Sequence, residues 1–132
     1  MKMQNVNYNK IKNLFLRQSY LDSWEDYGRS IRKANFIKWD YVVLTASNEA
    51  QAEAYRLQIA KRLEQKLLPA ATEYVVLPDP FGKRVGSGGA TFNVLRYIAE
   101  RCVKERETEC ANPFAGKRIM VIHSGGDSKR VP

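Results

Sequence analysis

Residues 39–69, WDYVVLTASNEAQAEAYRLQIAKRLEQKLLP, decide the fold class. Residues 39–46 form a short apolar and β-branched run of the length of a strand. Asn48 follows, with Gln51 three residues later as in a capping box, so a helix is expected to begin there. Its apolar positions extend the helix to about residue 68, and the proline that closes the quoted stretch ends it.

The rest of the chain repeats this alternation of strand and helix. Residues 73–77 (EYVVL) predict a second strand, a further helix is expected from about Thr91, and residues 117–123 (KRIMVIH) predict a third strand. Strands that alternate with helices form a parallel sheet with helices packed on its faces. We therefore expect an α/β fold in which ligands bind at the carboxyl ends of the strands.

Residues 9–38 precede this pattern and predict a helix broken near Gly28. Its apolar side chains recur at helical spacing, which is typical of core packing. These positions are Ile11, Leu14, Phe15, Leu21, Trp24, Tyr27 and Ile31. We divide the chain into an N-terminal helical segment, residues 1–38, and one domain, residues 39–132.

The formal net charge of +8 is concentrated in the N-terminal segment, which holds eight basic and three acidic residues. These charges are spread along a helical pattern, so a solvated helix face is favoured over a nucleic-acid patch. No stretch of the sequence is apolar enough to span a membrane, and the first residues do not resemble a signal peptide. The two cysteines, Cys102 and Cys110, fit reduced thiols in a cytoplasmic protein better than a disulfide.

A glycine-rich segment, GKRVGSGGAT at residues 82–91, follows the second predicted strand. Closely spaced glycines let a backbone approach a ligand, and the next helix adds the partial positive charge of its N-terminus. Lys83 and Arg84 add two cations, so the segment suits phosphate; the alternative is a flexible connector. It lacks the Gly-Lys-Ser/Thr of a P-loop, and Thr91 stands where a dinucleotide-binding fingerprint has glycine.

A second glycine segment, HSGGDSKRVP at residues 123–132, follows the third predicted strand. Its pattern resembles the loop with which sugar nucleotidyltransferases wrap a nucleoside triphosphate. Asp127 has three open interpretations: a metal ligand, a turn cap, or a partner of Arg130. His123 ends an apolar strand and is expected to be packed or hydrogen-bonded rather than catalytic.

In order and spacing, residues 39–63, residues 76–95 (VLPDPFGKRVGSGGATFNVL) and residues 116–132 (GKRIMVIHSGGDSKRVP) resemble the L-fucose-1-phosphate guanylyltransferase family. The likeness extends to the N-terminal part of the bifunctional fucokinase/fucose-1-phosphate guanylyltransferases. It implies a Rossmann-like nucleotidyltransferase fold that transfers GMP from GTP to L-fucose 1-phosphate, giving GDP-L-fucose and pyrophosphate. It also implies Mg²⁺, with the main metal carboxylates expected beyond Pro132.

Carried over by position, the resemblance assigns two sets of site residues. The nucleotide-binding set is Lys83, Gly86, Ser87, Gly88, Gly89, Ala90, Thr91, Gly125, Gly126 and Ser128. The catalytic set is Arg84, Lys129 and Arg130, whose cations would neutralise charge on the phosphates.

The expected partners in a longer chain are the remainder of the guanylyltransferase domain and a C-terminal fucokinase domain. We therefore expect this chain alone to be inactive. Two alternatives stay open: a part of the fucokinase activity, or a non-catalytic basic module that binds nucleic acid or protein.

Overall fold

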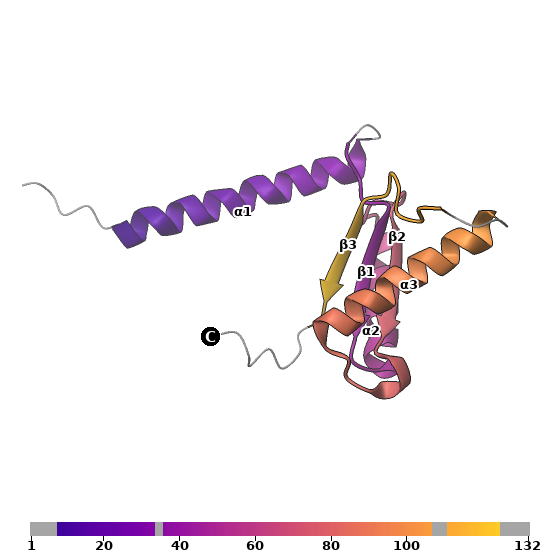
Figure 1. Ribbon diagram of the computed structural model, residues 1–132. Helices are drawn as coiled ribbons and strands as arrows, with labels where there is room; N and C mark the ends of the chain where they lie inside the picture. Colours follow the sequence, from indigo (N-terminus) through magenta and orange to yellow (C-terminus); the bar gives the residue numbers. More distant parts are fainter. Residues whose placement is uncertain (1–7, 34–35, 107–110, 125–132) are drawn as a thin grey trace, which may run out of the picture. The chain divides into compact units, whose positions relative to one another are not determined.

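The structure is a computed structural model that describes residues 8–33, 36–106 and 111–124 (Figure 1). Its elements are α1 (Tyr8–Arg32), β1 (Tyr41–Ala46), α2 (Glu49–Glu64), β2 (Glu73–Pro78), the short 3-10 helix η1 (Pro80–Gly82), α3 (Gly86–Arg106) and β3 (Ile119–His123). Contacts within the chain divide it into two compact units, Met1–Ile37 and Lys38–Pro132, which are described separately.

The second unit is built on a three-stranded parallel sheet in the order β2-β1-β3. Tyr41, at the start of β1, lies opposite Glu73 of β2 and Ile119 of β3. At the other end of the ladder, Thr45 lies opposite Leu77 and His123. The predicted α/β class with a parallel sheet is confirmed, and the arrangement is consistent with part of a Rossmann-like fold.

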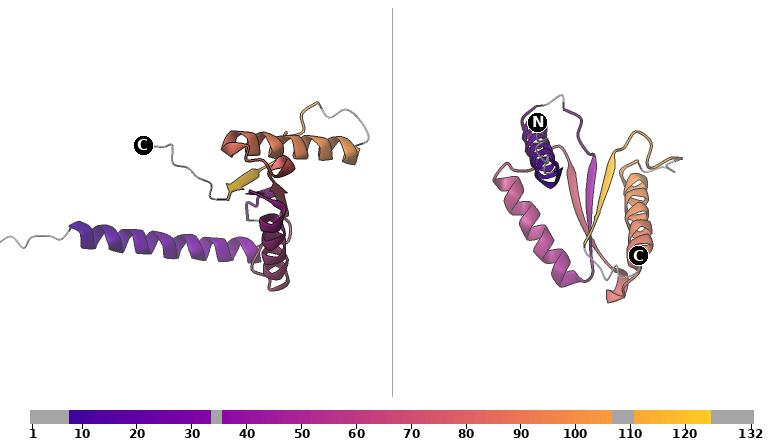
Figure 2. Two further views of the ribbon diagram at one scale, coloured as in Figure 1. Left: turned by 90° about the horizontal axis from the view of Figure 1, so that it is seen from below. Right: turned by 90° about the vertical axis from the view of Figure 1, so that its left-hand side faces the viewer.

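Helices α2 and α3 cover opposite faces of this sheet, as the right-hand view of Figure 2 shows. Alternate side chains of β1 explain the two layers, because successive residues of a strand point to opposite faces. One core cluster joins Tyr41 and Val43 to Val94 and Ile98 of α3. The other joins Ala46 to residues of α2 and β2. β1 is buried on both sides, which is typical of a parallel sheet.

The chain first crosses from β1 to β2 on one side and later returns to place β3 on the other side of β1. The connections therefore diverge between β1 and β3, at the carboxyl ends of these strands. In open α/β sheets, ligands bind at such a switch point. The strand order thus predicts that a ligand binds at the carboxyl ends of β1 and β3.

Helix α2 begins as predicted but ends earlier. The side chain of Asn48 accepts a hydrogen bond from the N–H of Gln51 at 2.8 Å, which confirms the predicted cap. The helix ends at Glu64 rather than near residue 68. Lys66 adopts a left-handed φ of 57°, and the N–H of Leu67 donates to the carbonyl of Arg62, the bond of a Schellman motif. This motif, rather than the later proline, terminates the helix.

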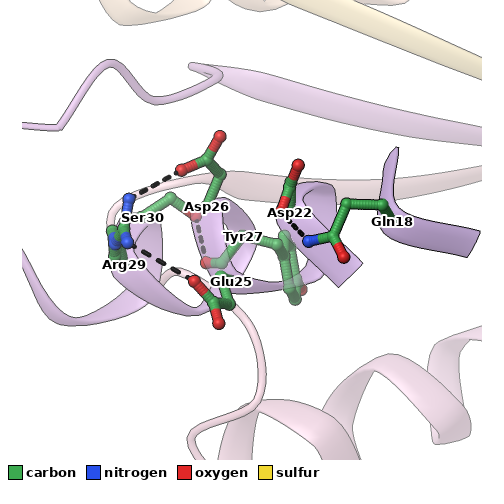
Figure 3. A network of polar contacts seen from close by, with 7 residues as sticks. All are labelled: Gln18, Asp22, Glu25, Asp26, Tyr27, Arg29 and Ser30. Carbon is green, nitrogen blue, oxygen red and sulfur yellow. Dashed lines mark hydrogen bonds and ion pairs between the residues drawn. The ribbon is translucent and has the colours of Figure 1, made fainter. Parts of the chain in front are cut away.

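In the first unit, α1 runs from Tyr8 to Arg32 without a break at Gly28, so the predicted interruption is wrong. The prediction that its apolar stripe is buried is also wrong within the described residues. Phe15 and Trp24 are each 73% exposed, and α1 buries none of its residues. Polar contacts between neighbouring turns line the second half of the helix (Figure 3). They include the ion pairs of Arg29 with Glu25 and Asp26.

Two further expectations concern the described residues. Cys102 is buried in α3 and is disulfide-bonded, so the prediction of a reduced thiol is wrong at this position. The other cysteine, Cys110, lies outside the described residues. Within the described part of the chain, no helix combines the length and apolar character needed to cross a membrane.

Candidate functional site at the carboxyl ends of the strands

Helix α3 begins at Gly86, five residues before the predicted start at Thr91. The segment GSGGAT is therefore the first part of a helix rather than a loop in front of one. Glycine lowers helix propensity, which is why the sequence predicts a later start. The helix forms because its buried side continues into this segment: Ala90 is 7% exposed and Val94 is fully buried.

The three glycines at the start of α3 differ in how a side chain at each position would be tolerated. Gly86 has a φ of 72°, in the left-handed region that other residues adopt only with strain. At Gly89, a Cβ atom would lie 2.7 Å from the Cβ of Val85, which is too close. Gly88 has open space around its Cα, with no atom within 4 Å of a built Cβ. The conformation of the segment therefore depends on two of these glycines, and the third leaves a surface uncovered.

This start of α3 is exposed and electropositive. Gly86, Ser87 and Gly88 are exposed, as are Lys83 and Arg84 just before the helix. The first turn contains no acidic residue, and Val85, which precedes the helix, has an aliphatic side chain that cannot accept a hydrogen bond. Backbone N–H groups at a helix start lack partners within the helix and favour an anion. The arrangement suits a phosphate group.

The remaining predicted residues are placed as follows. Gly89 and Thr91 are half-buried on α3, whereas the side chain of Ala90 faces the interior. The residues of the second glycine segment lie outside the described residues: Gly125, Gly126, Asp127, Ser128, Lys129 and Arg130. The structure describes the two residues before them, His123 and Ser124, which lie at the carboxyl end of β3.

A hydrogen-bond network at this edge includes residues that the sequence did not single out. His123 approaches Thr45 of β1 through Nδ1, at 3.3 Å from Oγ1, and Thr91 of α3 through Nε2, at 3.2 Å from Oγ1. The expectation that His123 is hydrogen-bonded is confirmed. Thr45 was missed because it continues an apolar strand, and the only signal for it is a hydroxyl at the strand's carboxyl end.

Gln51 is the second residue that the sequence analysis did not assign to the site. Its Oε1 accepts hydrogen bonds from the backbone N–H of Ser47 at 2.7 Å and from the Ser47 hydroxyl at 3.0 Å. The hydroxyl of Ser124 lies 3.4 Å from the same oxygen. Gln51 therefore connects the turn after β1 to the segment that follows β3, across the switch point of the sheet.

Comparisons with known proteins match this chain to three curated relatives. Fucose-1-phosphate guanylyltransferase of Mus musculus is 34% identical over 105 residues, and that of Homo sapiens is 36% identical over 105 residues. Each alignment covers 80% of this chain. The bifunctional fucokinase/GDP-fucose pyrophosphorylase of Arabidopsis thaliana is 36% identical over 123 residues, covering 83% of the chain.

The chain belongs to the fucose-1-phosphate guanylyltransferase family. It spans 16% of the length of the mouse and human relatives and 12% of the plant relative. No protein-family model matches the chain. No solved structure matches it either.

Membership of the guanylyltransferase family raises the question of the Mg²⁺ that the sequence resemblance implies. Mg²⁺ prefers oxygen ligands, usually one or two carboxylates together with phosphates of the substrate. Among residues 8–33, 36–106 and 111–124, no group of three or more His, Cys, Asp or Glu side chains is placed to hold a metal ion. The start of α3 is preceded by the cations Lys83 and Arg84 and has no acidic residue in its first turn, so this turn supplies no carboxylate ligand for a metal.

Proposed function

We propose that this chain contributes the nucleotide-phosphate site of an enzyme that transfers GMP from GTP to L-fucose 1-phosphate. The single observation that carries the proposal is the exposed, glycine-rich start of α3, with Lys83 and Arg84 before it. It lies in a chain whose relatives are named fucose-1-phosphate guanylyltransferase and GDP-fucose pyrophosphorylase. Those names supply the substrates, and the helix start supplies a place for phosphate.

In the proposed reaction, a phosphate oxygen of L-fucose 1-phosphate attacks the α-phosphorus of GTP. A new P–O bond forms, the bond between the α-phosphorus and the bridging oxygen breaks, and pyrophosphate leaves with the electron pair. No protein nucleophile is needed, so the protein acts by alignment and by stabilising charge. The described residues would bind phosphate oxygens through the first N–H groups of α3 and through Lys83 and Arg84.

The second glycine segment would complete this site as part of the same proposal. Lys129 and Arg130 would add two cations, and Gly125, Gly126 and Ser128 would supply close backbone and hydroxyl contacts. They follow Ser124, which lies at the switch point between β1 and β3. Mg²⁺ and a cytoplasmic location are also proposed, with the carboxylate ligands of the metal expected from residues other than those described.

The test uses the thermal stability of the chain with Mg²⁺ and GTP, ATP or GDP-L-fucose. Gly88→Asp is the informative variant, because the added side chain enters open space and places a carboxylate at a helix start. That charge favours the free helix but repels phosphate. We expect GTP and GDP-L-fucose to raise the Tm of the wild type but not that of Gly88→Asp. Gly88→Ala adds a methyl group without a charge, so it distinguishes electrostatic repulsion of the phosphate from steric obstruction.

The same variants in the natural protein that contains these residues test the reaction itself. Release of pyrophosphate from GTP should require L-fucose 1-phosphate and should fall strongly in Gly88→Asp. Dependence on L-fucose and ATP instead would favour the fucokinase alternative. Loss of all binding at raised ionic strength, without preference among nucleotides, would favour the basic nucleic-acid module.

A further inference from the structure

The last cross-strand pair of the sheet places two polar side chains, the buried Thr45 and the exposed His123, next to the start of α3. Tyr41 and Val43 point toward α3 from β1, and Val121 lies against the same cluster from β3. Alternation then directs Thr45 and His123, which are paired in the ladder, to that same face. The apolar core thus ends in a Thr–His pair at the carboxyl edge of the sheet.

The proton positions in this network follow from the hydrogen-bond partners. The hydroxyl of Thr91 donates its one proton to the carbonyl oxygen of Ser87 at 2.8 Å. The Oγ1 of Thr91 can therefore only accept from the Nε2 of His123, 3.2 Å away. In a neutral imidazole this arrangement assigns the proton to Nε2, and Nδ1 can then accept from the hydroxyl of Thr45.

This relay runs from the interior of the sheet to the exposed helix start. Thr45 is 5% exposed, whereas Ser87 is exposed in the first turn of α3. Each step has one donor and one acceptor, so a shift of the imidazole moves the carbonyl of Ser87 and the turn that carries it. His123 also immediately precedes Ser124, whose hydroxyl lies near Gln51.

We propose that His123 is a positioning residue that holds the first turn of α3 in the orientation that binds the phosphates of GTP. It acts through Thr91, and it links the segment after β3 to the helix start that follows β2. The inference rests on the proposed function and gives different roles to the two hydrogen bonds of His123. The bond of Nε2 to Thr91 supports nucleotide binding, whereas the bond of Nδ1 to Thr45 anchors the ring to β1.

Two substitutions distinguish the hydrogen bond of Nε2 from that of Nδ1. In His123→Gln, the side-chain amide can still donate to Thr91 from a position close to that of Nε2. In His123→Asn, the shorter side chain can accept from Thr45 but cannot reach Thr91. In the natural protein, we expect His123→Asn to raise the KM for GTP about three- to tenfold, as for one lost hydrogen bond, with little change in kcat. His123→Gln should stay within about twofold of the wild type.

A double-mutant cycle with Thr91→Val tests whether Thr91 carries the effect. Thr91→Val removes the hydroxyl and keeps the shape, and Thr91→Ser should restore the wild-type KM. If His123 acts through Thr91, the double variant His123→Asn/Thr91→Val has the same KM for GTP as either single variant. Independent, multiplying effects would overturn the proposal. So would equal KM values for His123→Asn and the wild type, or a loss of Tm with no change in KM.

Hydrogen exchange in the absence of nucleotide distinguishes a failure of this inference from a failure of the proposed function. His123→Asn and Thr91→Val should speed exchange of the amides in the first turns of α3, and His123→Gln should not. This result does not depend on which reaction the protein catalyses. If wild-type protein fails to use GTP while the exchange pattern holds, the proposed function is wrong and the positioning of α3 stands. An unchanged exchange pattern in all three variants would overturn the positioning role.

Discussion

Gly89 faces Val85 across the first turn of α3 so closely that a side chain at Gly89 would overlap it. A Cβ atom built on Gly89 lies 2.7 Å from the Cβ and 3.1 Å from one methyl carbon of Val85. The nearest atom belongs to the rigid stem of a β-branched residue, so it cannot rotate away. The start of α3 itself would have to move.

Gly89→Ala is therefore expected to destabilise the chain by about 1–3 kcal/mol, the usual cost of overpacking. Urea unfolding monitored by circular dichroism measures the change. Val85→Gly combined with Gly89→Ala is the matched control, because the three atoms nearest to the built Cβ, including the Cβ of Val85 itself, are then removed. If Gly89→Ala costs as much stability in the Val85→Gly background as in the wild type, the overlap is not the cause.

Gly88→Ala should have the opposite effect on the free protein. Gly88 lies in the helix with open space around it, so alanine should stabilise the chain by about 0.5–1 kcal/mol through helix propensity. The same methyl group would occupy the exposed surface on which we propose phosphate binds. We therefore expect a higher Tm without ligand and a smaller Tm increase with GTP. An unchanged GTP response would place the phosphate away from Gly88.

The strand–helix alternation could be predicted from the sequence because each strand is a short apolar run and each turn carries polar or glycine residues. The boundaries of the helices were harder to predict from the sequence. Four glycines within eight residues predicted a loop up to Thr91, yet α3 begins at Gly86 because its buried face fixes the helix against the sheet. Local propensity yields to packing in such a case.

The residues that complete the candidate site depend on strand order, which the sequence does not state. Thr45 and His123 lie 78 positions apart and meet only because β3 pairs with β1 rather than with β2. Nothing near Thr45 in the sequence distinguishes it from a buried strand residue. The prediction that residues 82–91 bind phosphate, in contrast, follows from local composition and needs no knowledge of the strand order; it stays a prediction.

Asn48→Ala tests the cap that begins α2. The Asn48 side chain accepts from the N–H of Gln51, and loss of such a cap typically costs about 1 kcal/mol. Asn48→Asp should retain the stability, since a carboxylate accepts the same hydrogen bond and favours the helix N-terminus. Thermal unfolding of the three proteins provides the measurement. Equal loss in both variants would indicate that the amide's contact with Ser47 matters more than the cap.

Lys66→Gly should stabilise the chain, although it removes a side chain. Lys66 is exposed and has a φ of 57°, a conformation that costs a residue other than glycine about 1–2 kcal/mol. Its N–H bonds to the carbonyl of Leu63 and the next N–H to that of Arg62, so the Schellman motif holds it there. Glycine removes the strain and gains freedom in the unfolded chain, which leaves a net stabilisation of about 1 kcal/mol.

Lys66→Ala separates backbone strain from the loss of charge, because alanine lacks the ammonium group and still has a Cβ. Urea unfolding should show Lys66→Gly more stable than the wild type and Lys66→Ala close to it. Equal stabilisation by both substitutions would mean that the ammonium group, rather than the left-handed backbone, is the unfavourable feature. In that case the charge at the C-terminal end of α2, and not the left-handed conformation of Lys66, would reduce the stability of the chain.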